Sequence, residues 1–380
     1  MILNRRLQAN PKSPIRRIGE EAAMIPGCLR LTIGEPDFDA PLPVRKKIAE
    51  AILAGDTHYP PNAGIPELRA EVAAMLNARF GSRYVSEETL VSVGSTEAIA
   101  AALFAILNPG DEVICLTPCF GLYKPLIEMA GGVFVPLPRK AEKGFSKAIL
   151  ASLLTERTKA VLFSSPNNPD GWVADHGTLS LLAETAKARD LFLIEDGAYD
   201  SLVFEDGFSA LPEWAEIRDR VIYISALSKT YAMTGVRLGY AAAEAEVMRE
   251  MVKAHSFLVV SAPGFVQRGC LGVFSLSPET MRETYRRRRD LALSRLSTMG
   301  LPCETPGGGF YVYPDIREFR MPSEDFCSRL MREAKLALVP ATAFSDEGHV
   351  RISCCYADGE LSLGLSRLAG FISGLREKHA

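Results

Sequence analysis

Seven short apolar runs, separated by helical patterns, constrain this 380-residue chain more than any other feature of its sequence. The runs are Thr89–Val93, Val113–Leu116, Val133–Leu137, Ala160–Ser164, Leu191–Glu195, Val221–Ser225 and Leu238–Ala242. Most of them are continuously apolar rather than alternating, which is typical of strands buried on both faces. Helical patterns lie between many of the runs, at Thr96–Leu107, Tyr123–Ala130, Lys147–Leu154 and Thr178–Arg189. This alternation predicts an α/β fold, a mostly parallel seven-stranded sheet with crossover helices.

The pattern changes after the last of these strands. Glu279–Ser297 predicts a long charged helix, and after Gly307–Gly309 short strands and helices follow in an α+β order. We expect this part to be a smaller domain, packed with the first forty residues, which carry no compact pattern of their own. The predicted division is a large domain at 44–275 and a small domain made of 1–43 and 276–380. The run Arg286–Arg289 is expected to be a solvated helix face.

Composition and charge exclude several classes of protein. Hydrophobic residues make up 47% and charged residues 23%, the balance of an ordinary globular protein. The formal net charge of −3 gives no basic surplus for binding nucleic acid or an anionic membrane. No apolar run is long enough to cross a bilayer, and no signal peptide is recognisable, so we expect a cytoplasmic protein. Eight cysteines without a C-x-x-C pair and five scattered histidines predict reduced thiols and no metal site.

Reactive and phosphate-binding side chains follow the strand Val221–Ser225. Lys229 comes four residues after the end of this strand, at the sheet edge where ligands bind in parallel sheets. The Ser228 hydroxyl and the Arg237 guanidinium suit a phosphate group. A lysine whose pKa is lowered by burial and by cationic neighbours can form a Schiff base. Taken alone, a lysine and an arginine near a strand end are more often surface residues.

Three more strand ends carry polar residues that suit the same kind of site. A carboxylate such as Asp196 would keep a pyridine nitrogen protonated, and the Tyr199 phenol would bond a ring hydroxyl. The turn SPNNPDG, fixed by its prolines, places Asn168 at the sheet edge. Ser95 and Thr96 open an apolar helix, whose N-terminus can bind an anion. Each of these features alone also fits an ordinary helix cap or turn.

The four segments together resemble the fold type I pyridoxal 5'-phosphate enzymes and, among them, the class I/II aminotransferases. The resemblance covers nearly the whole chain. It implies that Lys229 is the Schiff-base lysine and that Asp196 holds the pyridine nitrogen. It implies that Tyr199 and Asn168 contact the ring hydroxyl. It assigns the cofactor phosphate to four residues, Ser95, Thr96, Ser228 and Arg237.

Further segments extend the resemblance to the substrate and to a second subunit. LTIGEPDF (Leu31–Phe38) looks like the family's substrate-side loop, in which Gly34 lies against the substrate. HVRIS places Arg351 at the arginine that binds the substrate α-carboxylate, and PCFGLY places Phe120 at the aromatic that stacks on the cofactor ring. HYPPNAGIPELR resembles the segment whose tyrosine, here Tyr59, reaches the phosphate in the neighbouring subunit. The resemblance therefore implies a homodimer with shared active sites. Core packing of Phe120 and a surface ion pair of Arg351 are the structural alternatives.

The chain departs from the family pattern at several positions. Ser165 and Asp170 replace the first asparagine and the threonine of the N-P-x-N-P-T-G turn. Gly197 stands in place of an acidic residue, and Ala226 in place of a serine. Thr96 stands where some aspartate aminotransferases of this branch carry a lysine. The sequence therefore does not support a preference for an acidic donor, and the amino donor stays open.

The resemblance implies an aminotransferase that moves an amino group between an L-amino acid and a 2-oxo acid. The kinetics would be ping-pong, through pyridoxamine phosphate. A carbon–sulfur β-lyase, a cyclase or an oxidase on the same scaffold would use the same lysine, aspartate and arginine, so the motifs leave these reactions open. An aminotransferase-like transcription regulator would need a DNA-binding domain, for which too few residues precede Gly34.

Overall fold

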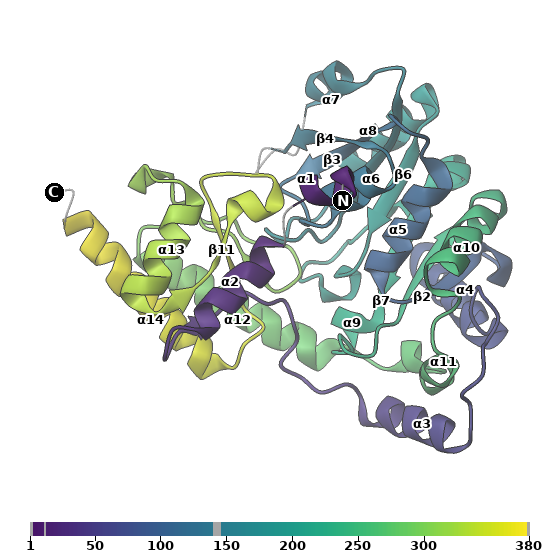
Figure 1. Cartoon of the computed structure of the whole chain (residues 1–380), viewed down its shortest axis with the longest axis horizontal. Helices are drawn as coiled ribbons and strands as arrows, with labels where there is room; N and C mark the ends of the chain where they lie inside the picture. The colour runs from purple at the N-terminus through teal and green to yellow at the C-terminus, as the bar shows by residue number, and fades with distance from the viewer. Residues whose placement is uncertain (1–2, 11–12, 140–145, 378–380) are drawn as a thin grey trace.

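A seven-stranded sheet organises the larger part of the computed structural model, which describes residues 3–10, 13–139 and 146–377 (Figure 1). The strand order is β2-β8-β7-β6-β5-β3-β4, and only β8 runs antiparallel to its neighbours. The bounds are β2 (Thr89–Ser92), β3 (Glu112–Thr117), β4 (Val133–Pro138), β5 (Thr158–Ser164), β6 (Phe192–Asp196), β7 (Val221–Ala226) and β8 (Gly239–Ala243). Each of the seven predicted apolar runs is therefore confirmed as a strand of one mostly parallel sheet.

Helices cover both faces of this sheet because its central strands are apolar on both sides. One apolar core joins the sheet to α5, α6 and α10, and a second joins it to α4, α8 and α11. The helices of this part are α3 (Leu42–Leu53), α4 (Pro66–Phe80), α5 (Ser95–Ile106), α6 (Tyr123–Met129), α7 (Lys147–Leu153), α8 (His176–Arg189), α9 (Leu227–Thr230), α10 (Ala245–Val259) and α11 (Gly264–Gly269). The core fixes the strands, and the strand ends then carry the polar residues described below.

The C-terminal part has an apolar core of its own and lies beside the sheet (Figure 1). Its helices are α12 (Glu279–Thr298), α13 (Ser323–Ala334) and α14 (Asp358–Glu377). Its strands are β9 (Tyr311–Val312), β10 (Leu336–Ala337), β11 (Val339–Pro340) and β12 (Val350–Ser353). In the part of the chain that the structure describes, no helix is long and apolar enough to cross a membrane.

The N-terminal segment divides between the two parts. Strand β1 (Leu29–Arg30) pairs with β10, and α2 (Pro14–Ala23) packs on β10 and β11, as expected. Helix α1 (Arg5–Ala9) instead contacts α6, and Asn10 Nδ2 donates a 2.8 Å hydrogen bond to Glu128 Oε2. The expectation that the whole segment packs with the C-terminal part is therefore wrong for α1, which buries none of its own residues.

The arginine run on α12 is only half solvated. Arg288 and Arg289 are buried, with 6% and 7% of their surfaces exposed. Arg288 donates to both carboxylate oxygens of Asp37, at 2.8 and 2.7 Å, and to Asp358 Oδ1 at 2.8 Å. The expectation of a solvated face is wrong for these two residues, because their side chains turn inward and Arg288 ties the Leu31–Phe38 loop to α12 and α14.

Candidate active site

The carboxyl ends of four strands bring the predicted site residues to one edge of the sheet. β2, β5, β6 and β7 run in the same direction, so their ends share this edge. α5 follows β2, the SPNNPDG turn follows β5, Asp196 ends β6 and α9 follows β7. The short helix α9 was not predicted, and it carries Lys229.

Lys229 lies against the substrate-side loop. Its Nζ donates a 2.6 Å hydrogen bond to the carbonyl oxygen of Gly34. Burial lowers the pKa of Lys229 from its ordinary 10.5 to about 8, against the opposing effects of Cys355 and Glu35. An amine with this pKa is neutral in a useful fraction of molecules near neutral pH, and a neutral amine is a nucleophile and a base.

The Leu31–Phe38 loop is held along β12 by successive hydrogen bonds. Arg351 Nη2 donates to the carbonyl of Thr32, and the Cys355 thiol lies 3.2 Å from the carbonyl oxygen of Ile33. Gly34 follows, with its carbonyl turned to Lys229. A Cβ on Gly34 would lie 1.7 Å from the Tyr311 hydroxyl oxygen, so no other residue fits here unless Tyr311 moves.

Asp196 is a buried carboxylate with two donors. Tyr123 Oη donates to Oδ2 at 2.8 Å, and the Ala198 backbone N–H donates to Oδ1 at 3.1 Å. Burial raises the pKa of Asp196 to about 6, and the bond from Tyr123 opposes this shift. The carboxylate is therefore ionised at neutral pH and fixed in direction. Sequence reasoning missed Tyr123, although it lies three residues after Phe120 at the start of α6.

Two further pairs link the sheet edge to the C-terminal part. The hydroxyls of Tyr199 and Tyr311 lie 3.0 Å apart. Arg351 Nη1 donates a 2.7 Å hydrogen bond to Asn168 Oδ1. The Arg351 guanidinium lies 4.3 Å from the ring centre of Tyr311 and 4.9 Å from that of Phe344. Arg351 is 1% exposed, and within the described residues it makes no ion pair, so a surface ion pair does not explain this residue.

The start of α5 has the features of an anion-binding site. Gly94 precedes this helix with φ of 80°, and a Cβ there would lie 2.6 Å from an Arg237 guanidinium nitrogen. A Cβ on Gly239 would lie 2.6 Å from the Gly94 carbonyl carbon. Arg237 bonds the Thr234 carbonyl, and no carboxylate among the described residues pairs with it. Backbone N–H groups at a helix start and an unpaired guanidinium together form an anion cradle.

The other residues predicted for the cofactor lie on several elements. Ser95 and Thr96 are the first two residues of α5, and Ser228 precedes Lys229 on α9. Phe120 is half-buried and meets the Tyr123 ring edge-on, with ring centres 5.7 Å apart. Tyr59 stands apart, 86% exposed, and within the described residues nothing joins it to the other predicted site residues.

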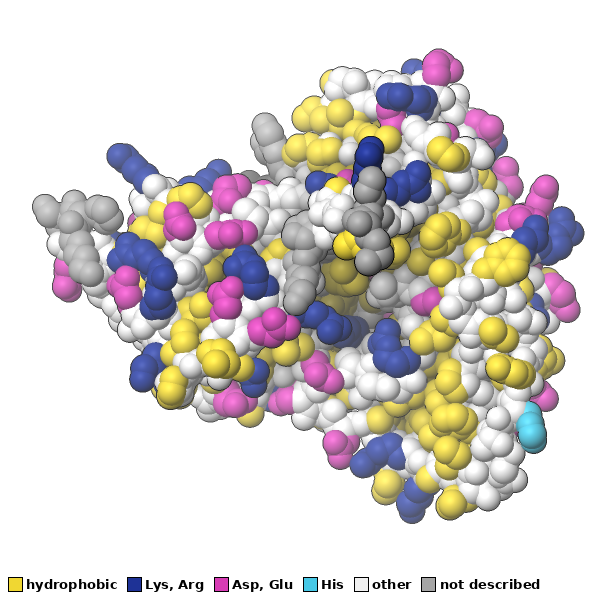
Figure 2. All heavy atoms as spheres, viewed as in Figure 1, with side chains coloured by type: hydrophobic (Ala, Val, Ile, Leu, Met, Phe, Trp, Pro, Cys, Tyr) yellow, Lys and Arg dark blue, Asp and Glu magenta, His cyan; other side chains and the backbone are white. Residues whose placement is uncertain are grey.

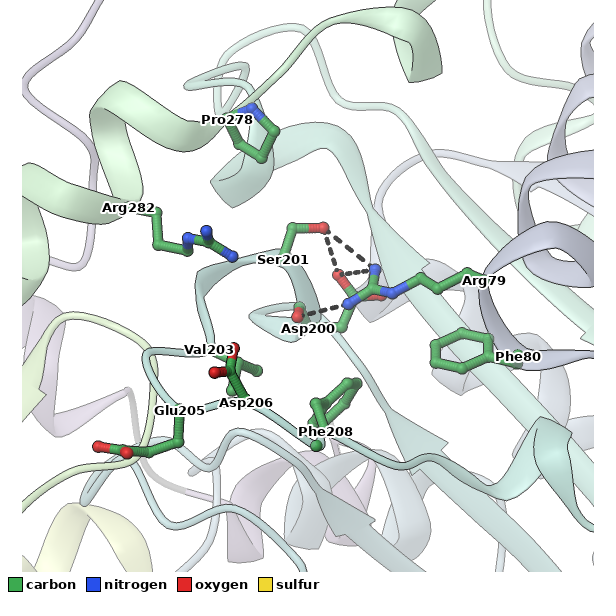
Figure 3. A pocket seen from close by; sticks show the side chains of 11 residues that line it. Arg79, Phe80, Asp200, Ser201, Val203, Glu205, Asp206, Phe208, Pro278 and Arg282 are labelled. Carbon is green, nitrogen blue, oxygen red and sulfur yellow. Dashed lines mark hydrogen bonds and ion pairs between the residues drawn. The ribbon is translucent and has the colours of Figure 1, made fainter.

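A cavity of about 370 Å³ opens near this edge but includes none of the predicted site residues (Figure 3). Arg79 points into it and bonds the Asp200 carbonyl at 2.6 Å and the Ser201 hydroxyl at 3.2 Å. Asp200 directly follows Tyr199, and its carboxylate accepts a 2.5 Å bond from Tyr223. Arg79 and Tyr223 therefore hold the backbone behind Tyr199, and the cavity is separate from the lysine site.

Comparisons with known proteins agree with this arrangement. The family model described as "Aminotransferase class I and II" matches residues 26–368. An aspartate aminotransferase of Pyrococcus abyssi is 36% identical, covering 100% of this chain and 99% of its own. An aromatic-amino-acid aminotransferase of Thermococcus litoralis is 34% identical, with 97% of both chains covered.

The solved structure of the Thermus thermophilus aspartate aminotransferase with maleate superposes with a TM-score of 0.92 at 35% identity, covering 97% of this chain and 99% of that one. The sheet topology agrees with the same family. The chain belongs to the class I and II aminotransferases of fold type I, a family that depends on pyridoxal phosphate, and it is an aminotransferase acting between an L-amino acid and a 2-oxo acid.

Proposed function

We propose that this aminotransferase holds pyridoxal 5'-phosphate at the sheet edge, with Lys229 as its covalent attachment. The observation that carries the proposal is the place of Lys229. A buried amine with its pKa lowered to about 8 lies on the same sheet edge as the ionised Asp196 and the Arg237 guanidinium, which has no carboxylate partner among the described residues. An aldehyde, a pyridine nitrogen and a phosphate need these three partners.

The remaining residues fit the rest of the cofactor. Asp196, held by Tyr123 and Ala198, would keep the ring nitrogen protonated. Tyr199 and Asn168 would bond the ring hydroxyl, and Phe120 would stack on the ring. The phosphate would occupy the cradle formed by the start of α5, Ser228 and Arg237. When bound, the cofactor supplies an electron-withdrawing ring that makes the substrate α-hydrogen acidic.

The protein's own groups then bind the substrate and move the proton. The Arg351 guanidinium, held by Asn168 and two aromatic rings, would bind the substrate α-carboxylate. The Lys229 amine, once free, would take the proton from the substrate α-carbon and return it as an acid. Gly34 offers a carbonyl that holds the Lys229 amine nearby, and its missing side chain leaves room for the Tyr311 hydroxyl.

We also propose a homodimer in which Tyr59 completes the partner's phosphate site. Leu53, Tyr59 and Phe257 are each more than 80% exposed, which is unusual for large apolar side chains. Asn62 bonds Ser256 and the Val260 carbonyl, so the Tyr59 segment lies beside the end of α10. Hydrophobic side chains also gather over α11 and α3 in Figure 2. A second copy covering this face would bury them.

Subunit mixing tests this dimer. Lys229→Ala and Tyr59→Ala subunits are each expected to be nearly inactive. Unfolded and refolded together, they should form hybrids with one intact site and regain activity. A lack of recovery in hybrids confirmed by co-purification through a tag on only one of the two variants would mean that Tyr59 does not act across the interface.

We further propose a cytoplasmic location. We also propose a large domain at residues 44–275 and a small domain made of 1–43 and 276–380. All eight cysteines are free and six of them are buried, which fits a reducing compartment. The separate apolar cores of the sheet and of the C-terminal part support the division.

The donor is best found by absorption spectroscopy. The purified protein is mixed with single L-amino acids, without any 2-oxo acid. Conversion of the cofactor band to that of pyridoxamine phosphate by some donors supports the proposal and names the substrate class. The relatives named above act on aspartate and on aromatic amino acids, so both belong in the panel. A protein that takes up no cofactor would overturn the proposal.

A further inference from the structure

A buried ion pair stands beside the turn that carries Asn168. Arg139 follows β4, and its guanidinium contacts the Asp170 carboxylate. The Arg139 side chain is 1% exposed, and Asp170 is 14% exposed. The guanidinium also lies 4.2 Å from the ring centre of Trp172. An ion pair so deeply buried is costly to form, and breaking one side of it is costlier still.

Asp170 is one of the departures from the family pattern, which has a neutral threonine there. Its second oxygen accepts from Asn167 Nδ2 at 2.8 Å and from the Trp172 backbone N–H at 3.2 Å. The Asn167 side chain also bonds the Pro118 carbonyl at 2.9 Å. The carboxylate therefore fixes both ends of the turn, and Arg139 fixes the carboxylate.

The SPNNPDG turn also holds Arg351, the arginine proposed to bind the substrate. Asn168 lies between Asn167 and Asp170 in the turn, and its Oδ1 accepts from Arg351 Nη1. Arg351 has no carboxylate partner among the described residues, and its Nε has no hydrogen-bond partner there. Its direction thus depends on Asn168, on the Thr32 carbonyl and on two aromatic rings.

We propose that Arg139 and Asp170 are a positioning pair that orients Asn168 and, through it, Arg351 toward the substrate α-carboxylate. The inference rests on the proposed role of Arg351. Arg139 has two guanidinium nitrogens, Nε and Nη1, without a partner in the described part of the chain. Asp170 is thus its one carboxylate partner there, and loss of that charge frees the guanidinium to move.

The test uses the holoenzyme and the best donor from the amino-acid panel. Asp170→Asn keeps the shape and the acceptor of Asp170 but removes its charge. It should raise the donor KM roughly tenfold, as expected for loss of a charge-assisted contact, and leave kcat within about twofold. The double variant Arg139→Gln, Asp170→Asn removes the unpaired cation. It should recover thermal stability while the KM stays high, and it replaces the single variant if that one does not fold.

A matched control separates positioning from folding. Glu88 pairs with Arg218, whose guanidinium lies 5.1 Å from the ring centre of Tyr84, so this pair also joins a buried carboxylate to an arginine beside an aromatic ring, although Arg218 is 30% exposed. Glu88→Gln should lower thermal stability without changing the donor KM. A normal KM in the folded Asp170→Asn and double variants, with a raised KM in Arg351→Lys, would overturn the positioning pair alone. An unchanged KM in Arg351→Lys would overturn the proposed role of Arg351 instead.

Discussion

The Nζ of Lys229 lies 2.6 Å from the carbonyl oxygen of Gly34, although the two residues are 195 positions apart in the chain. This hydrogen bond joins the helix after β7 to the loop before α3. The loop is fixed on its other side by the bidentate pair of Asp37 with Arg288. The amine that we propose as attachment and base is therefore placed by both parts of the molecule.

Loss of the Lys229 amine should abolish transamination. Lys229→Ala is expected to reduce kcat by about a thousandfold or more, because no other described amine is placed to move the substrate proton. Lys253→Ala is the control, since Lys253 is exposed on α10 and Glu250 is its one ion-pair partner among the described residues. Steady-state assays with the best donor measure the kcat of both variants and of wild type. Retention of more than a tenth of the wild-type kcat by Lys229→Ala would contradict the assignment.

Tyr123 should set the protonation of Asp196. Tyr123→Phe removes a donor to the carboxylate, so the pKa of Asp196 rises further above about 6. The acid side of the pH–kcat profile should then move to higher pH, with kcat at neutral pH lowered up to about tenfold. Tyr84→Phe is the matched control, because the buried Tyr84 hydroxyl has no hydrogen-bond partner in the described structure. An unshifted pH–kcat profile in Tyr123→Phe would show that the hydrogen bond from Tyr123 does not affect the protonation of Asp196.

Much of this site was predictable because strand ends and sequence motifs coincide. Lys229, Asp196, Asn168 and the start of α5 each follow an apolar run, and parallel strands bring such positions together. Side chains that reach the site from elsewhere carried no such signal. Tyr123 lies on the next helix, and Tyr311 reaches Tyr199 from the C-terminal part. Pairing across parts depends on tertiary packing, which periodicity does not describe.

The arginine run shows the same limit. Four consecutive arginines look alike in sequence, yet only the direction of each around α12 decides which one is buried.

Arg288→Gln should lower the free energy of unfolding by roughly 2 kcal/mol, because Asp37 and Asp358 lose a charged donor. Arg287→Gln, which removes an exposed partner of the same Asp358, should change it little. Urea unfolding of both variants measures the two losses of unfolding free energy. Equal losses would contradict the view that the buried Arg288 contributes more than the exposed Arg287.

Glu195 should make the stability of the cofactor-free protein depend on pH. Burial raises the pKa of Glu195 from 4.5 to about 8, so the folded chain keeps a proton that the unfolded chain releases. The stability from this group is present below about pH 4.5 and is lost as pH rises through about 8. As pH rises from about 4.5 to about 8, the free energy of unfolding of Glu195→Gln should therefore increase relative to that of wild type, by up to about 1.4 kcal/mol per pH unit. If the free energies of unfolding of wild type and Glu195→Gln changed with pH in the same way, the raised pKa of Glu195 would be contradicted.

The most direct test of the central claim is the position of the cofactor on the chain. The purified holoenzyme is reduced with borohydride, which fixes the bond between cofactor and protein, and is then digested for peptide mass spectrometry. We expect a single pyridoxyl modification, on Lys229. Modification of a different lysine, or complete release of an intact cofactor, would contradict it.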